Sequence, residues 1–282
     1  MPVRFEINRA GLLEVRQSFD FPAVYLDHWA VRLFSTDTAL GNRFLASLRA
    51  SGGALVISHM NLAELTGPED PQTVEQAAQF LESVLPNAYF AMFDLQQAID
   101  QESQPRELRT RLPAPPDIEL LRTIGRERPD DMRPFTIANL IRVIAAHRDH
   151  LGTLFRESNQ RMADRINHVR LDADAVEQAR DFRGHPVGLA SRAVMQELMR
   201  PTLLDQRLRI VANDGADFMH AIVSIVYCDF VLLDRRWEEL HARMVRRFAE
   251  LRYPLSVAQV FSRRHDGVER FLLALEARRI ER

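Results

Sequence analysis

The stretch Ala23-Val24-Tyr25-Leu26-Asp27 is a short apolar run that ends at a carboxylate, and two further apolar runs later in the chain are also followed by a carboxylate. One of them, from Leu55 to Ser58, leads into a short predicted helix that carries Glu64. Another, from Phe230 to Leu233, ends at Asp234. Helical segments separate these runs, which predicts βαβ crossovers and a mainly parallel sheet. The carboxyl ends of parallel strands meet at one edge of a sheet, so the carboxylates should lie together there.

Apolar spacing and turn residues predict the other elements of the α/β core. A further strand is expected over 88–93, with others at 208–212 and 257–261. The expected helices cover 39–50, 61–65, 73–85, 95–102, 217–227, 237–251 and 267–278.

The middle of the chain has a different character, because strand-like runs are absent from about 104 to 205. Apolar residues at steps of three and four predict one long amphipathic helix over 136–169, bent near Gly152, and shorter helices over 172–182 and 190–199. The expected organisation is an α/β core formed by 1–103 and 206–282, with 104–205 as a helical insertion.

Composition limits the class of protein. The chain has 282 residues, 46% of them hydrophobic, and a net charge of -2, so no global field would attract polyanions. All 37 basic residues are Arg, which indicates a bacterial source and excludes lysine-based chemistry. Cys228 is the single cysteine, and the sequence contains neither a membrane-spanning run nor a signal peptide. A cytoplasmic protein without membrane association is expected.

A fourth carboxylate, Asp217, opens the predicted helix 217–227, and Asp214 lies three residues before it. Asp214 would face the same pocket if the helix began earlier, although Asn213 and Asp214 suit an N-cap equally well. Each acid taken alone also fits ordinary capping or surface placement. Several carboxylates crowded together would raise one another's pKa, and a divalent cation would relieve that repulsion.

The order of these segments resembles the PIN-domain family: the acid after the first strand is Asp27, the acid after the second is Glu64, the acid on a later helix is Asp217, and the acid after the next strand is Asp234. The resemblance implies a three-layer α/β/α fold and metal-dependent hydrolysis of phosphodiester bonds. The first three acids would be metal ligands, and Asp234 a ligand or the group that orients a water. The chain departs from the family at Leu233, where a small hydroxyl residue is usual, and in its large insertion.

Hard divalent ions favour carboxylate oxygens, so the expected cofactor is Mg²⁺ or Mn²⁺, with Asp214 as a further candidate ligand. Substrate phosphates would require arginines near the acids, and the best placed are Arg235, Arg236, Arg263 and Arg264. Arginine pairs also form solvated helix faces, and Arg235 and Arg236 could pair with Asp234 instead. Ser58 and Asn61 could contact phosphate or water, or cap the helix of Glu64. His220 is expected to be a hydrogen-bonded core histidine.

The resemblance therefore implies a metal-dependent nuclease that acts on RNA rather than DNA. The alternative is a PIN-like scaffold with little catalysis that binds a protein or nucleic-acid partner through the insertion. A phosphohydrolase of small nucleotides is a third reading. An antitoxin as the protein partner and a homodimer are further options.

Overall fold

The fold was obtained as a computed structural model, which describes residues 3–9, 11, 13–67, 70–104, 112–118, 120–121, 136–181, 184, 188–205, 207 and 210–278. An N-terminal hairpin comes first, formed by the antiparallel strands β1 (Val3–Ile7) and β2 (Leu13–Gln17). The hairpin was not expected from the sequence. The side chain of Gln17 in β2 donates to the carbonyl of Phe90 and accepts from its N–H. These two hydrogen bonds join the hairpin to the edge of the main sheet.

The main sheet has five parallel strands in the order β5-β4-β3-β6-β7. These strands are β3 (Ala23–Leu26), β4 (Ala54–Ile57), β5 (Ala88–Phe90), β6 (Phe230–Leu232) and β7 (Gln259–Phe261). At the centre, Tyr25 lies beside Val56 on one side and Val231 on the other. The chain therefore builds one half of the sheet before residue 91 and the other half after residue 229.

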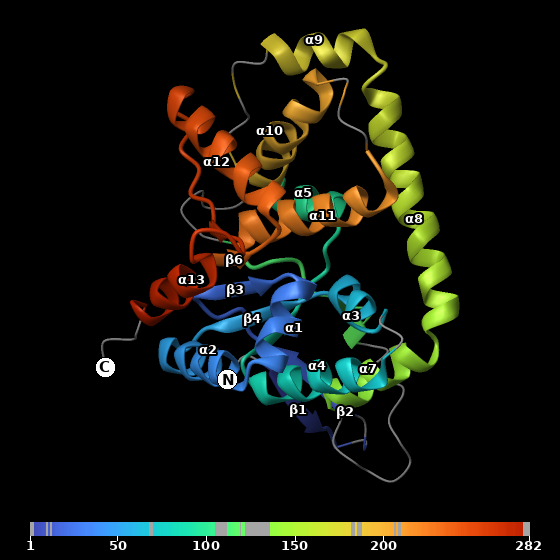
Figure 1. The fold of residues 1–282 in the computed structure, drawn as a ribbon, viewed down its shortest axis with the longest axis vertical. Coiled ribbons are helices and arrows are strands. Elements are labelled where there is room, and N and C mark those ends of the chain that lie inside the picture. Colours follow the sequence, from blue (N-terminus) through green and yellow to red (C-terminus); the bar gives the residue numbers. More distant parts are fainter. Residues whose placement is uncertain are drawn as a thin grey trace.

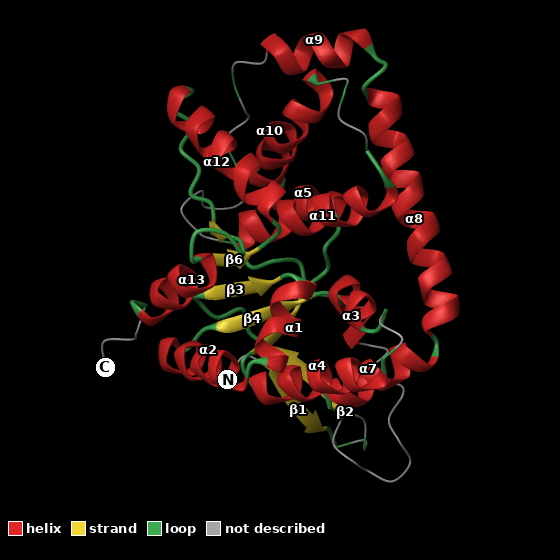
Figure 2. Ribbon diagram, in the orientation of Figure 1, coloured by secondary structure: helices red, strands yellow, loops and turns green. Residues whose placement is uncertain are grey.

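Helices cover both faces of the sheet, as Figures 1 and 2 show, so the expected three-layer α/β/α fold is confirmed. Successive strand residues point to opposite faces. Val24 and Leu26 belong to the core shared with one helical layer, whereas Ala23 and Tyr25 belong to the core shared with the other. The first layer contains α1 (His28–Thr36), α2 (Thr38–Ser51), α3 (His59–Leu65), α4 (Pro71–Val84), α7 (Ile137–Ala146) and α13 (Gly267–Glu276). The second contains α5 (Leu95–Glu102), α10 (Ala190–Leu204), α11 (Ala212–Tyr227) and α12 (Arg235–Glu250).

Two helices extend beyond these layers. They are α8 (Arg148–Val169), which runs along one side of the molecule, and α9 (Ala173–Asp181), which follows it (Figure 1). The backbone of α8 crosses α11 closely, because a Cβ on Gly215 would lie 2.9 Å from the Cβ of Met162 and 3.1 Å from the carbonyl oxygen of Asn159. The segment 104–205 thus supplies helices to both layers, through α7 and α10, and the domain boundary drawn from the sequence stays a prediction.

Three local predictions were wrong. The helix expected over 136–169 is two helices, and the break is at His147, whose ring nitrogen Nδ1 contacts the carbonyl of Val143 at 3.0 Å, rather than near Gly152. No strand forms at 210–212, where α11 already begins at Ala212, and Leu208 and Arg209 lie outside the described residues. As a result Asp217 lies in the second turn of α11 and does not open it.

Among the described residues, no helix combines the length and the apolar character that crossing a bilayer would require.

Candidate metal centre

The candidate site lies at the carboxyl end of the two central strands β3 and β6, where the order of strands along the sheet reverses. Such a switch point is where open parallel sheets bind their ligands. Asp27 directly follows β3, and its backbone N–H donates to the carbonyl of Leu232 in β6 at 3.0 Å. Asp27 is also the N-cap of α1, with its carboxylate accepting from the N–H of His28 at 2.7 Å. Asp234 follows β6 and occupies the N-cap of α12 without a side-chain capping bond.

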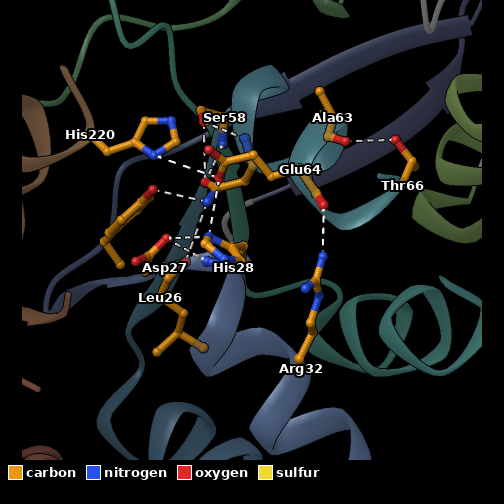
Figure 3. A network of polar contacts seen from close by, with 11 residues as sticks. Leu26, Asp27, His28, Arg32, Ser58, Ala63, Glu64, Thr66 and His220 are labelled. Carbon is orange, nitrogen blue, oxygen red and sulfur yellow. Dashed lines mark hydrogen bonds and ion pairs between the residues drawn. The ribbon is translucent and has the colours of Figure 1, made fainter. Parts of the chain in front are cut away.

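Glu64 reaches the same edge from α3, and a buried polar cluster fixes that helix (Figure 3). Ser58 caps α3 by accepting from the N–H of Asn61 at 3.1 Å, and Asn61 donates through Nδ2 to the hydroxyl of Tyr25 at 2.9 Å. The carbonyl of Glu64 accepts from Arg32 on α1 at 2.9 Å. Ser58 and Asn61 are almost fully buried, so they support the helix from beneath the site. Their expected contact with substrate stays a prediction.

The cap of α3 can be tested by replacing Ser58 with Ala. The change removes the acceptor for the Asn61 N–H in a buried position, and we expect the free energy of unfolding to fall by about 1 kcal/mol. Urea denaturation measures it. In the control Ser103→Ala, an exposed hydroxyl that donates to the carbonyl of Ile99 is lost, and the change should stay within about 0.5 kcal/mol. Equal losses in both variants would contradict a special role for the cap.

His28 lies between two of the carboxylates and was missed in the sequence. Its Nδ1 lies 2.9 Å from Oδ1 of Asp27 and 3.5 Å from Oε2 of Glu64. The hydrogen bond to Asp27, followed by the nearby carboxylate of Glu64, raises the pKa of His28 to about 10. In this arrangement an imidazolium neutralises part of the acidic cluster. The one available signal was its position directly after Asp27.

Asp217 completes the cluster from α11. Its pKa is raised to about 7, first by burial and then by the negative charges of Asp27, Glu64 and Asp234. Burial and the charge of Asp27 likewise raise the pKa of Asp234, against a lowering effect of His28 and Arg263. These mutual effects show that four acids from separate segments share one electrostatic environment.

His220 lies one turn after Asp217 and is 1% exposed. Its Nδ1 approaches Oε2 of Glu64 to 3.9 Å, which is too long for a hydrogen bond (Figure 3). Neither ring nitrogen finds a hydrogen-bond partner among the described residues. The expectation of a hydrogen-bonded core histidine was wrong in that respect, although the burial was correctly predicted.

Two of the predicted substrate-binding arginines, Arg235 and Arg236, have acidic partners away from the site. Arg236 pairs with Asp214, and Arg235 lies 2.6 Å from Glu239, so neither forms the pair with Asp234 that the sequence allowed. Asp214 also accepts from the N–H of Val211 at 2.8 Å at the start of α11. These contacts hold Asp214 in a capping role, and its expected role as a metal ligand stays a prediction.

Of the other two predicted arginines, Arg263 acts on the acids through its charge. The exposed Arg263 stacks over the ring of Trp29 at 4.6 Å, and its charge lowers the pKa of Asp234. Trp29 itself is buried beneath it.

The donor set fits a divalent metal ion. One oxygen each from Asp27 and Glu64 and one nitrogen of His28 lie within 4.8 Å of one another. Oε2 of Glu64 is buried and makes no hydrogen bond within the described part of the chain, so its acceptor capacity is unused. A bound cation would use this oxygen and would also lower the raised pKa of Asp217.

Comparison with known proteins gives no relative: no family model, no curated protein and no solved structure matches the chain.

Proposed function

We propose that this protein is a metal-dependent nuclease with PIN-like architecture, acting on RNA rather than DNA. The observation that carries the proposal is the cluster at the carboxyl end of the central strands, where ligand atoms of Asp27, His28 and Glu64 lie within 4.8 Å of one another. The pKa of Asp217, raised by burial and by the charges of Asp27, Glu64 and Asp234, agrees with it. Carboxylates crowded at the switch point of the sheet repel one another, and a bound cation would relieve that repulsion.

The chemistry follows from the groups present. A divalent ion such as Mg²⁺ or Mn²⁺, when bound, lowers the pKa of a water and offsets negative charge on a phosphate. Asp27, Glu64 and Asp217 would hold this ion, and the exposed Asp234 would orient the attacking water. Asn61 and Arg32 would act indirectly, because they fix the helix that carries Glu64.

Substrate binding is assigned to Arg263 in place of Arg235 and Arg236, which have acidic partners. Replacing Arg263 with Ala should raise the KM for single-stranded RNA several-fold, lower the salt dependence of binding by about one charge, and leave kcat nearly unchanged. Steady-state kinetics at two salt concentrations would measure this. Arg243→Ala, on the exposed face of α12, is the matched control and should leave KM unchanged. An equal effect in both variants would indicate a general charge effect and no contact at the site.

The nuclease proposal is tested by incubating single-stranded RNA, duplex RNA and single-stranded DNA with the protein in Mn²⁺, Mg²⁺ or chelator. The variant Glu64→Gln keeps the shape of the side chain and removes its charge, and Glu157→Gln on the exposed face of α8 is the control. Metal-dependent cleavage by wild type and control, absent in Glu64→Gln, would support the proposal. Hydrolysis of small nucleotides alone would replace it with a phosphohydrolase. Tight metal binding without any turnover would favour the partner-binding scaffold.

A further inference from the structure

Two imidazole rings converge on the same carboxylate oxygen. Nδ1 of His28 lies 3.5 Å from Oε2 of Glu64, and Nδ1 of His220 approaches that atom to 3.9 Å from a different helix (Figure 3). Neither histidine is required by a site made of carboxylates alone. Their presence alters which metal ion the site would favour.

The spacing around His28 fits neighbouring ligands of one ion. Bonds from small divalent ions to protein ligands are about 2.1 Å long, so adjacent ligand atoms lie about 3 to 3.5 Å apart. Nδ1 of His28 is separated from Oδ1 of Asp27 by 2.9 Å and from Oε2 of Glu64 by 3.5 Å. The nitrogen therefore lies at such a separation from each of the two oxygens, and ligand atoms of the three residues lie within 4.8 Å of one another.

His220 provides an independent observation. The ring is 1% exposed, and neither of its nitrogens makes a hydrogen bond within the part of the chain that the structure describes. A buried polar group without a partner costs about 1 to 3 kcal/mol. A water held by an ion beside Glu64 would supply the missing partner, which makes His220 an outer neighbour that positions such a water.

We propose that the site binds a first-row transition metal ion in preference to Mg²⁺, with His28 Nδ1 as a ligand beside Asp27 and Glu64, and with His220 as an outer partner. Imidazole nitrogen binds Mn²⁺, Fe²⁺, Co²⁺ and Zn²⁺ better than it binds Mg²⁺, which keeps oxygen ligands and waters. Binding releases the Nδ1 proton of His28 to solvent. The inference rests on the metal site of the proposed function and names the class of ion.

The test uses metal-free full-length protein and three variants, His28→Gln, His220→Gln and His168→Gln. The last replaces an exposed histidine near the end of α8 and serves as the control. Pulsed electron paramagnetic resonance of the Mn²⁺-loaded protein reports whether nitrogen is bound to the ion. Calorimetric titration with Mg²⁺, Mn²⁺ and Co²⁺ measures selectivity, and thermal unfolding in chelator verifies that each variant folds.

We expect a nitrogen coupling in wild type, in His168→Gln and in His220→Gln, and none in His28→Gln. Affinity should rise from Mg²⁺ to Mn²⁺ to Co²⁺, and His28→Gln should lose about tenfold or more for Co²⁺ with little change for Mg²⁺. His220→Gln should weaken Mn²⁺ binding by about tenfold.

An absent nitrogen coupling in Mn²⁺-loaded wild type would overturn the inference without needing any variant. The nuclease proposal would still stand if Glu64→Gln lost metal-dependent cleavage. Conversely, a nitrogen-bound ion in a protein that cleaves none of the substrates would support the inference and refute the nuclease. Failure of all three ions to bind would overturn the metal site on which both depend.

Discussion

Replacing Asp217 with Asn should reduce metal-dependent cleavage of RNA by about 10²- to 10³-fold. Asp217 is half-buried, and its pKa of about 7 shows that burial and the neighbouring acids disfavour its charge. An ion at the site would reverse that balance and hold the carboxylate in its charged form, because an opposite charge nearby favours ionisation. Asn cannot provide this charge. Initial rates of cleavage in Mn²⁺ would measure the loss.

The matched control is Asp214→Asn, three residues earlier on α11. The carboxylate of Asp214 pairs with Arg236 and caps the helix, so its loss should change cleavage only a few-fold and should mainly lower stability. If both variants lost cleavage alike, Asp214 would be a metal ligand, as the sequence allowed. If Asp217→Asn cleaved RNA at the wild-type rate, Asp217 would lie outside the catalytic site.

Without metal, the protein should become less stable as the pH rises from about 4 to about 7 and above. The pKa of Asp217 is about 7 in the folded protein, against an ordinary value of 3.8. The folded state therefore binds more protons over this interval, and the stabilisation from protonation is complete below about pH 4 and lost as the pH passes about 7. We expect Asp217 to account for about 2 kcal/mol after solvent screening.

Urea denaturation in chelator at a series of pH values would measure this dependence. Asp217→Asn should flatten it and should be more stable than wild type at pH 8, whereas Asp100→Asn, on the exposed face of α5, should follow wild type. His28 adds a slope of the same sign at higher pH, since its raised pKa of about 10 gives stability that is lost as pH rises through that value. A steep slope between pH 4 and 7 that persists in Asp217→Asn would show that another group titrates there.

The central strands could be predicted from the sequence because each is a compact run of buried β-forming residues next to a turn or a carboxylate, as in β3 and β6. The N-terminal hairpin was missed although β1 and β2 alternate apolar with charged residues, which is a strand signal. It lies apart from the βα alternation of the core, and its strands pair only with each other. The break between α7 and α8 was misplaced because apolar spacing continues across His147. Local spacing shows which face of a helix is buried, and it carries little information about where the backbone turns.

At the site, the four carboxylates were predicted from their order along the chain, and the structure brings them into one electrostatic environment. The positions of the two histidines near Glu64 could not be predicted. His28 lies directly after Asp27, and His220 lies one turn after Asp217, but their approach to Glu64 depends on how α1, α3 and α11 pack. The partners of Arg235 and Arg236 likewise follow from tertiary contacts with no local signature.

The close crossing of α8 and α11 at Gly215 has a consequence for protein engineering. Gly215 lies two residues before Asp217, and the backbone and Met162 of α8 leave no space for even a methyl group there. A shortened version that joins residue 104 directly to residue 206 would lack α8, which packs against α11, the helix that carries Asp217 and His220. A shortened form of this protein should therefore keep α8, and a transfer of the sheet and its acids to a smaller α/β scaffold would have to provide another helix in its place.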